Sequence, residues 1–388
     1  MNFGIVCEFN PFHNGHKYLF ESARNMGAEN IVCAMSGNAV QRGSLAIADK
    51  YLRAEAVVEC GADLVLEIPF PWSSASAEYF ASAGIKILAP YCDAVIFGSE
   101  CGDIQLLKRA ADASLEESFK DEFERRKKSG EGAASAYFSL LGESVGRELL
   151  SNDILGVEYI KAAKKQGVNL EFYTIKRMGS GYREEALDMA QFPSATAIRC
   201  AWNEGKDAFE GYMPKEASEI YQKAFLEGNI TDEKQLESAY LMYFRLCKQE
   251  DLMDIAEAEG GIAARICSIA KESKNFEEFW NTLRTKRYTD AKLRRAMLFS
   301  LTSVKKELLL SEPEYVYLLG ANNNGRKLMA NVKKADIQGT IKVVTKPADA
   351  NKNSLQFGAE ERLNSVFSLA RENSCAQGDM YRKNAFIK

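Results

Sequence analysis

The sequence has few of the residues that characterise secreted, membrane-bound or zinc-binding proteins. Among its 388 residues are only two histidines, eight prolines and three tryptophans. The nine cysteines are odd in number and scattered, and no two of them form a Cys-x-x-Cys pair. This pattern argues against a disulfide framework and against a zinc site. The start of the sequence has a strand pattern that includes Glu8, so we expect no signal peptide, and no apolar run is long enough to span a bilayer. We therefore expect a cytoplasmic protein without a membrane anchor or a protein-bound metal.

The charges are distributed unevenly along the chain. The formal net charge is −4, yet residues 281–388 contain 20 Lys and Arg against 10 Asp and Glu. Residues 1–280 are correspondingly acidic, with 30 basic against 44 acidic residues. A basic C-terminal third predicts contact with a polyanion such as RNA. An ordinary solvated basic surface is the alternative, and charge alone does not decide between the two.

Both histidines lie in one four-residue window, His13-Asn14-Gly15-His16. An apolar run over residues 3–9 predicts a strand before the window, and residues 16–24 predict a helix after it. A glycine-containing turn that leads into a helix N-terminus is suited to bind phosphate, because unpaired backbone amides and the helix dipole favour negative charge. The alternative is a pair of surface or helix-capping histidines.

Strand and helix patterns alternate through the first 200 residues. Apolar runs at residues 31–35, 63–68, 93–97 and 170–175 predict further strands, with helices between them. This alternation indicates an α/β fold with a Rossmann-like, doubly wound parallel sheet. Ligands bind at the carboxyl ends of strands in such sheets, and His13, Ser36, Gly98 and Arg177 all fall there.

The remainder of the chain predicts a different organisation. Helical patterns cover residues 214–226, 232–248, 252–274, 276–285 and 289–303, and strand character returns at 315–319 and 340–344. We therefore expect a catalytic domain over residues 1–205, a helical region over 206–310, and a small basic α+β part over 311–388. The segment 281–388 is the part expected to face a polyanion.

Several motifs together resemble one protein family. The run Pro11-Phe12-His13-Asn14-Gly15-His16 resembles the HxGH signature of the nucleotidyltransferase superfamily, which includes adenylyltransferases and class I aminoacyl-tRNA synthetases. The longer run over residues 8–16 is similar to that of the bacterial tRNA(Met) cytidine acetate ligases. Further segments keep the order of that family along the chain: residues 35–38, 41–43, 97–100, 151–156, 175–177, 194–199 and 285–289.

This resemblance implies a two-step ligase. Acetate attacks the α-phosphorus of ATP, which gives acetyl-adenylate and pyrophosphate. The N4 amine of the wobble cytidine in elongator tRNA(Met) then attacks the acyl carbon and expels AMP, so acetyl-CoA is not expected as a substrate. Magnesium on the triphosphate is consistent with this chemistry, although no metal ligand can be assigned from the sequence.

The resemblance also assigns roles to residues. His13 and His16 are the expected catalytic pair, suited to stabilise charge at the pentavalent phosphorus without proton transfer. The segment 194–199 resembles a second phosphate-binding motif of the superfamily, in which Ala195 replaces one hydroxyl residue. An N-capped helix is the alternative explanation for that segment, and a helix cap is the alternative for Asn152. The expected ATP-binding residues are Val6, Cys7, Glu8, Phe9, Asn10, Pro11, Phe12, Asn14, Gly15, Lys17, Tyr18, Leu19, Gly98, Asn152, Arg177, Met178, Ser194, Thr196 and Arg199.

Two further groups of residues are candidates for substrate contacts. Asn38, Gln41 and Arg42 follow a predicted strand and could bind substrate there. A cluster of cations with one aromatic ring is typical of an RNA backbone contact, although an ordinary solvated helix has the same pattern. That cluster consists of Lys286, Arg287, Tyr288, Lys292, Arg294 and Arg295.

Two other functions remain open from the sequence. A small-molecule adenylyltransferase of the same superfamily would have the same residues through Arg199, but it would not require a basic C-terminal third. A non-catalytic RNA-binding protein with a nucleotide site is the other alternative. The intact pair of histidines argues against the second of these.

Overall fold

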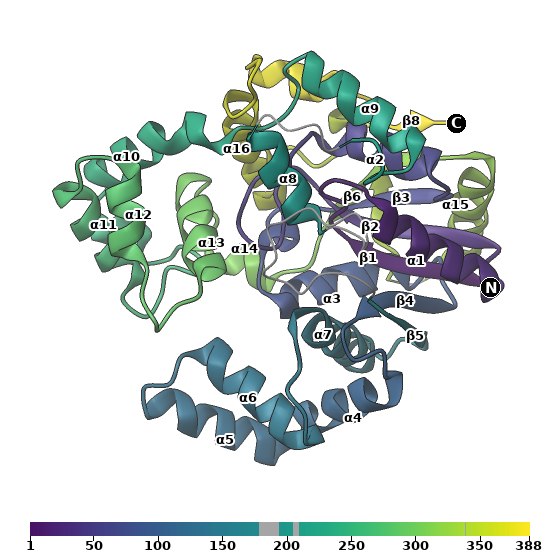
Figure 1. The fold of residues 1–388 in the computed structure, drawn as a ribbon, viewed down its shortest axis with the longest axis horizontal. Coiled ribbons are helices and arrows are strands. Elements are labelled where there is room, and N and C mark those ends of the chain that lie inside the picture. The colour runs from purple at the N-terminus through teal and green to yellow at the C-terminus, as the bar shows by residue number, and fades with distance from the viewer. Residues whose placement is uncertain (178–193, 205–208, 338) are drawn as a thin grey trace.

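One mixed sheet forms the centre of the molecule in the computed structural model, which describes residues 1–177, 194–204, 209–337 and 339–388 (Figure 1). Its strand order is β5-β4-β1-β2-β3-β6-β7, and β8 also pairs with β6. The strands are β1 (Asn2–Cys7), β2 (Asn30–Ser36), β3 (Leu64–Ile68), β4 (Ala94–Ser99), β5 (Glu171–Lys176), β6 (Tyr315–Ala321), β7 (Lys342–Val344) and β8 (Phe386–Ile387).

The first five strands are parallel and are covered by helices on both faces. Side chains of β1 alternate between two cores: Phe3 and Ile5 pack in the core of α1 and α2, whereas Val6 packs in the core of α3 and α7. This period of two is what a strand buried on both faces requires. The helices are α1 (Asn14–Asn25), α2 (Lys50–Glu59), α3 (Ala77–Leu88) and α7 (Ser151–Gln166). The expected fold class is confirmed.

Two helical lobes extend from this sheet, one toward the bottom and the other toward the left of the view in Figure 1. The first lies between β4 and α7 and contains α4 (Ile104–Leu115), α5 (Glu117–Lys128) and α6 (Ala133–Val145). The second follows α8 (Ala195–Asn203) and α9 (Lys215–Leu226) and is built from α10 (Glu237–Leu246), α11 (Ile262–Glu272), α12 (Phe276–Leu283), α13 (Asp290–Leu301) and α14 (Lys306–Leu310). No helix of the described chain is long and apolar enough to cross a membrane.

One expected helix is shorter than its sequence pattern suggests. The pattern over residues 252–274 predicts a continuous helix, but α11 begins only at Ile262. Gly260 and Gly261 have φ angles of 69° and 91°, in the left-handed region that a right-handed helix cannot include. The two glycines therefore end the preceding turn and set the start of α11.

The C-terminal segment completes the N-terminal sheet. Strand β6 runs antiparallel to β3, with Leu66 opposite Leu318, and β7 and β8 pair with β6. The expected small α+β part therefore has no sheet of its own. Helices α15 (Asn323–Ala335) and α16 (Leu355–Leu369) accompany these strands, and short 3₁₀ turns lie at Trp72–Ser74, Glu233–Leu236, Gln249–Leu252, Pro347–Asp349 and Gln377–Tyr381.

Candidate active site

The two histidines lie at the junction of β1 and α1, where His13 is the N-cap of the helix. The Nδ1 atom of His13 accepts a hydrogen bond from the Gly15 amide at 3.1 Å, and Nδ1 of His16 accepts one from the His13 amide at 3.3 Å. The ring centroids are 3.7 Å apart. Because each Nδ1 is an acceptor, a neutral ring carries its proton on Nε2. Both imidazoles can therefore offer an Nε2–H group to a ligand.

Both rings are held in the neutral form by their surroundings. His13 is 5% exposed, and burial together with the positive charges of Arg177 and Arg199 lowers its pKa to about 3. Burial, His13 and Arg177 also lower the pKa of His16 well below its usual range. At neutral pH the pair can therefore act as hydrogen-bond donors to an anion, but it holds no extra proton to transfer.

Neighbouring segments fix the loop that carries the histidines. The His16 ring lies 4.7 Å from the ring of Phe9. The backbone amide of Asn14 donates to the Tyr212 carbonyl at 3.0 Å, and the side-chain amide of Asn14 donates to the Gly211 carbonyl at 2.8 Å. The loop is therefore attached to the segment before α9 as well as to the sheet.

The segment 194–199 reaches the same loop. Ser194 is the N-cap of α8, and its hydroxyl accepts a hydrogen bond from the Ala197 amide at 3.1 Å. One turn later, the Arg199 guanidinium donates to the Asn10 carbonyl and, at 3.1 Å, to the Thr196 hydroxyl. The helix-cap explanation is thus correct for Ser194, while Arg199 lies directly beside the histidine loop.

A second cation comes from the adjacent strands β4 and β5. A Cβ atom at Gly98 would lie 3.1 Å from Cγ of Arg177, so the arginine stem passes over bare backbone. The Arg177 amide donates to the Ser99 carbonyl at 2.9 Å, and this bond fixes the backbone from which the arginine side chain extends. The positive charge of Arg42 acts on both Arg177 and Arg199. Three guanidinium groups and two imidazole donors therefore lie within electrostatic reach of one another at the carboxyl ends of the strands, and the space beside them is called the crevice below. This set of groups has the composition of a polyphosphate site.

Asn152 has a partner that the sequence did not indicate. The Glu100 carboxylate accepts hydrogen bonds from the backbone amides of Asn152 and Asp153, at 3.1 and 3.0 Å, and from the Asn152 side chain at 2.6 Å. The N-cap of α7 is Leu150, so the helix-cap explanation for Asn152 is wrong. Glu100, which follows β4, satisfies the first amides of α7 and holds the Asn152 side chain.

Several expected ATP-binding residues have side chains that point elsewhere. Lys17 donates to the Cys60 carbonyl at 3.0 Å, at the C-terminal end of α2. Glu8 accepts from the Gln41 amide at 2.9 Å. The side chains of Val6, Cys7, Phe9, Phe12 and Leu19 are buried in the two cores, so these residues can contribute only backbone groups. Met178 lies outside the described residues.

Sequence reasoning missed Arg53, which is fully buried. Its guanidinium donates to the carbonyls of Glu8 at 2.6 Å and Ser36 at 2.8 Å, to that of Gly37, and to that of Ala48 at 3.1 Å. It therefore fixes the carboxyl ends of β1 and β2 relative to each other. A lone arginine among the apolar residues of helix 50–59 is the signal that could have identified it.

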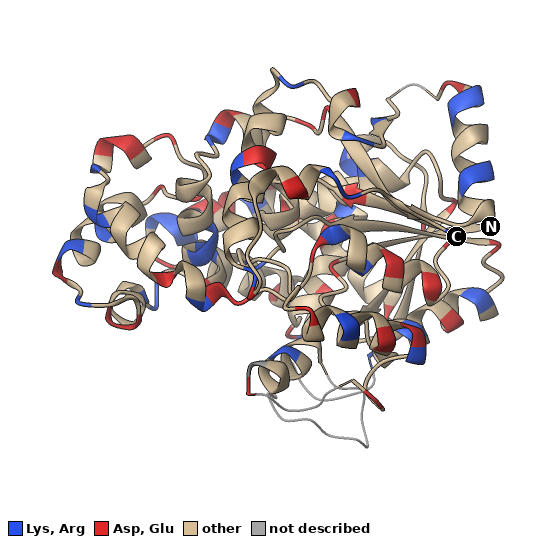
Figure 2. Ribbon diagram, turned by 90° about the horizontal axis from the view of Figure 1, so that it is seen from above, with Lys and Arg blue, Asp and Glu red and all other residues tan. Residues whose placement is uncertain are grey.

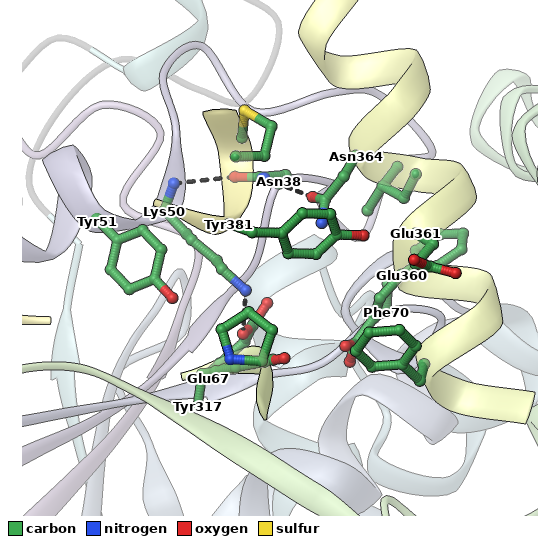
Figure 3. Close-up of a pocket in the computed structure, with 14 residues that line it drawn as sticks. Asn38, Lys50, Tyr51, Glu67, Phe70, Tyr317, Glu360, Glu361, Asn364 and Tyr381 are labelled. Atoms are coloured by element: carbon green, nitrogen blue, oxygen red, sulfur yellow. Dashed lines mark hydrogen bonds and ion pairs between the residues drawn. The ribbon is translucent and has the colours of Figure 1, made fainter. Parts of the chain in front are cut away.

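A cavity lies between the 38–50 segment, β3 and α16, where Asn38, Lys50, Glu67 and Glu360 line it (Figure 3). Asn38, a candidate for substrate binding, lines this cavity instead of the crevice and accepts a hydrogen bond from the Lys50 amide at 2.9 Å. Lys50 forms an ion pair with Glu67 at 2.5 Å, and the Tyr315 hydroxyl donates to Glu360 at 2.7 Å. With a volume of about 20 Å³ the cavity holds about one water molecule.

This cavity gives the stability of the protein a specific pH dependence. Burial and the charge of Glu67 raise the pKa of Glu360 to about 8. The folded chain therefore binds one more proton than the unfolded chain between about pH 4.5 and pH 8. The contribution of Glu360 is fully favourable below that range and is lost as the pH rises through it. We expect the Glu360→Gln variant not to show this loss in the free energy of unfolding, which is on the order of a few kcal/mol at pH 9. Urea titrations of variant and parent at pH 5 and pH 9 measure it. Parallel pH profiles of variant and parent would contradict it.

The candidate RNA-contacting residues divide into exposed and buried groups. Arg295 is 6% exposed and forms an ion pair with Glu257 at 2.9 Å. The prediction that it contacts RNA is therefore wrong. Lys292 pairs with Glu259 at 2.9 Å. Lys286 and Arg287 lie exposed in the turn before α13.

Helix α13 also contacts the loop that lies against the crevice. A Cβ atom at Gly43 would lie 2.4 Å from the backbone nitrogen of Arg295, so the 41–43 loop touches α13. The adjacent Arg294 is exposed, and its guanidinium lies 5.0 Å from the Trp280 ring. The basic helix thus starts at the candidate RNA-facing turn and passes the edge of the crevice.

Comparison with known proteins places the chain among proteins of one kind. The family model described as HIGH Nucleotidyl Transferase matches residues 1–382. The tRNA(Met) cytidine acetate ligase of Caldanaerobacter subterraneus subsp. tengcongensis is 34% identical over 386 residues, which cover 95% of each chain. The protein of the same name from Thermotoga petrophila is 34% identical, over 98% of this chain and 99% of that one. The crystal structure of Thermotoga maritima TmcAL bound with alpha-thio ATP matches with a TM-score of 0.87 and 29% identity, over the whole of both chains.

Proposed function

The chain belongs to the HIGH nucleotidyl transferase family and, within it, to the tRNA(Met) cytidine acetate ligases, and from this premise we propose how its residues perform the reaction. The enzyme is an ATP-dependent ligase that acetylates a tRNA cytidine. We propose that it joins acetate to ATP as acetyl-adenylate and then transfers the acetyl group to N4 of the wobble cytidine of elongator tRNA(Met), with release of AMP.

The observation that carries this proposal is the pair of neutral imidazoles beside three arginines. In the first step a carboxylate oxygen of acetate forms a bond to the α-phosphorus, and the bond from that phosphorus to the pyrophosphate oxygen breaks. Negative charge increases on the phosphate oxygens as this happens. The Nε2–H groups of His13 and His16 are placed to stabilise it, and Arg199 is placed to hold the departing pyrophosphate.

Strands β4 and β5 supply the proposed nucleoside side of the crevice. Gly98 presents bare backbone that the Arg177 side chain crosses, and the positive charge of Arg177 lowers the pKa values of both histidines. The T. maritima relative is described as bound with alpha-thio ATP, which supports ATP as the nucleotide here. Among the described residues, no three His, Cys, Asp or Glu side chains form a metal site, so we assign no protein ligand to magnesium.

We expect Gly98→Val and Arg177→Ala each to raise the KM for ATP by about tenfold or more. The valine would collide with the Arg177 stem and fill the space over the strand, and loss of the guanidinium removes a charge-assisted hydrogen bond of about 1.5–3 kcal/mol. Steady-state pyrophosphate exchange over a range of ATP concentrations measures the effect. Lys164→Ala, an exposed lysine on α7, is the matched control. Unchanged ATP affinity in both variants would show that the nucleotide lies elsewhere.

In the second step the tRNA must reach the acetyl-adenylate. The cytidine N4 forms a bond to the acyl carbon, the bond from that carbon to the adenylate oxygen breaks, and the amine loses a proton. Expulsion of AMP makes this step favourable, so the proposal includes no acetyl-CoA. We propose that Lys286 and Arg287 in the turn, and Arg294 on α13, bind the tRNA backbone, because they are exposed cations on the element that passes the crevice.

We expect Lys286→Glu combined with Arg287→Glu to reduce acetyl transfer to tRNA steeply. Loss of two phosphate contacts lowers the slope of log affinity against log salt by about 1.4–1.8. Labelled acetate incorporated into tRNA(Met), and tRNA binding at several salt concentrations, measure the two effects. Lys333→Glu with Lys334→Glu on α15 changes the charge equally at exposed positions on another face. Equal transfer by the two double variants would place the RNA surface elsewhere.

A further inference from the structure

The C-terminal turn of α5 carries four consecutive cations, Arg125, Arg126, Lys127 and Lys128. Arg125, Lys127 and Lys128 are exposed. These residues belong to the acidic part of the sequence, so the charge asymmetry along the chain does not draw attention to them. Figure 2 shows basic and acidic residues intermixed along the helices of the molecule, so position in the sequence is a poor guide to the charge of a surface.

One close contact joins the end of α5 to the candidate RNA-facing turn. A Cβ atom at Gly132, just after α5, would lie 2.9 Å from the carbonyl oxygen of Arg287. The backbones of Gly132 and Arg287 therefore touch, and the two helical lobes meet at this point. Lys127 and Lys128 thus lie on one side of the contact, and Lys286 and Arg287 lie on the other.

The local ion pairs do not neutralise this surface. Arg125 and Arg126 pair with Glu122, and Lys127 pairs with Glu124, but exposed pairs of this kind contribute little and exchange readily for other partners. Lys128, Lys286 and Arg287 form no ion pair within the part of the chain that the structure describes. Cations in the last turn of a helix also complement its dipole, which would explain α5 alone but not the matching cations on the other lobe.

We propose that the end of α5 and the turn 285–288 form one continuous RNA-binding surface, the junction surface, composed of Arg125, Lys127, Lys128, Lys286 and Arg287. This inference rests on the proposed function, because the RNA is taken to be its tRNA substrate. Polyphosphate suits the surface because cations from two elements lie on either side of one contact, and the Tyr288 ring, 5.4 Å from the Arg287 guanidinium, adds the aromatic group that often accompanies cations in RNA contacts. Helix α13 begins beside the surface and leads to the crevice, so RNA bound there extends toward the acetyl-adenylate.

The test compares three variants of the full-length protein in equilibrium binding to tRNA(Met) at several salt concentrations. Lys127→Glu with Lys128→Glu is expected to weaken binding about tenfold or more and to lower the salt slope by about 1.4–1.8. Lys127→Arg with Lys128→Arg keeps the charge and should bind as the parent does. Gly132→Val changes no charge but separates the lobes at their contact, and it should also weaken binding.

Two controls distinguish the possible failures. Pyrophosphate exchange with acetate in the absence of tRNA reports on the crevice alone: if the parent shows none, the proposed function fails. If the parent exchanges and binds tRNA, but the α5 charge reversal binds with the same affinity and salt slope, the junction surface is wrong and the α5 cations serve the helix dipole. If the α5 charge reversal weakened binding to an acidic protein but left tRNA binding unchanged, the assignment of the junction surface to RNA would also be wrong.

Discussion

His16→Ala is expected to lower acetate-dependent ATP–pyrophosphate exchange by about a hundredfold or more, the usual effect of removing a donor to the transition state. The imidazole is neutral, and its Nδ1 is occupied by the His13 amide. Its Nε2–H is therefore the group lost in the variant. Because this donor acts on charge that develops during attack, the loss should fall mainly on kcat, with little change in the KM for ATP.

The fold should survive this change, since His16 is half-buried at the surface of the crevice. Glu21→Ala, at an exposed position one turn further along α1, is the matched control and should exchange at the parental rate. Circular dichroism and thermal unfolding of both variants exclude misfolding as the cause. A folded His16→Ala protein with normal turnover would refute the assigned role of the histidines.

The second large effect concerns Arg53→Met, which should destabilise the protein by about 3 kcal/mol or more. The variant leaves three buried carbonyls and the half-buried one of Glu8 without the Arg53 donor, and each buried group that stays unsatisfied costs about 1–3 kcal/mol. Removal of the buried charge offsets part of this cost, because the guanidinium no longer has to be desolvated. Urea unfolding monitored by fluorescence measures the difference in the free energy of unfolding.

Arg53→Lys distinguishes the guanidinium from its charge. A lysine ammonium cannot reproduce the planar array of donors that reaches the ends of β1 and β2 together, so this variant should also be destabilised, though by less. Arg109→Met, at an exposed position on α4, should change stability by no more than about 0.5 kcal/mol. If both Arg53 variants unfold at the same urea concentration as the parent, the bonds to the strand ends contribute nothing.

The sequence was sufficient to predict the parallel core of the fold. Apolar runs and intervening helices are local signals, and the carboxyl ends of parallel strands necessarily lie at one edge of the sheet. That rule is enough to predict that His13, Gly98 and Arg177 lie close together. The pairing of β6 with β3 was not predictable in the same way. A short apolar run indicates a strand, but it does not identify a partner some 250 residues away.

Charged residues were the main limit on predicting the site. Arg53 and Arg295 look like surface arginines in a helix, but both are buried and hydrogen-bonded. Glu100 lies in the matched segment 97–100, but the sequence does not indicate its partner, because its role at the start of α7 depends on a turn that brings two distant segments together. Periodicity shows which face of a helix is apolar, but it does not show which cation is paired inside the protein.

The most direct test of the account is pyrophosphate exchange by the parent protein with neither tRNA nor acetyl-CoA present. We expect radiolabel from pyrophosphate to enter ATP only when acetate is added, because the crevice alone completes the first step. Exchange that ignores acetate but requires a phosphorylated cofactor precursor would identify a small-molecule adenylyltransferase instead. Binding of tRNA with no exchange under any condition would contradict the enzymatic account altogether and leave an RNA-binding protein.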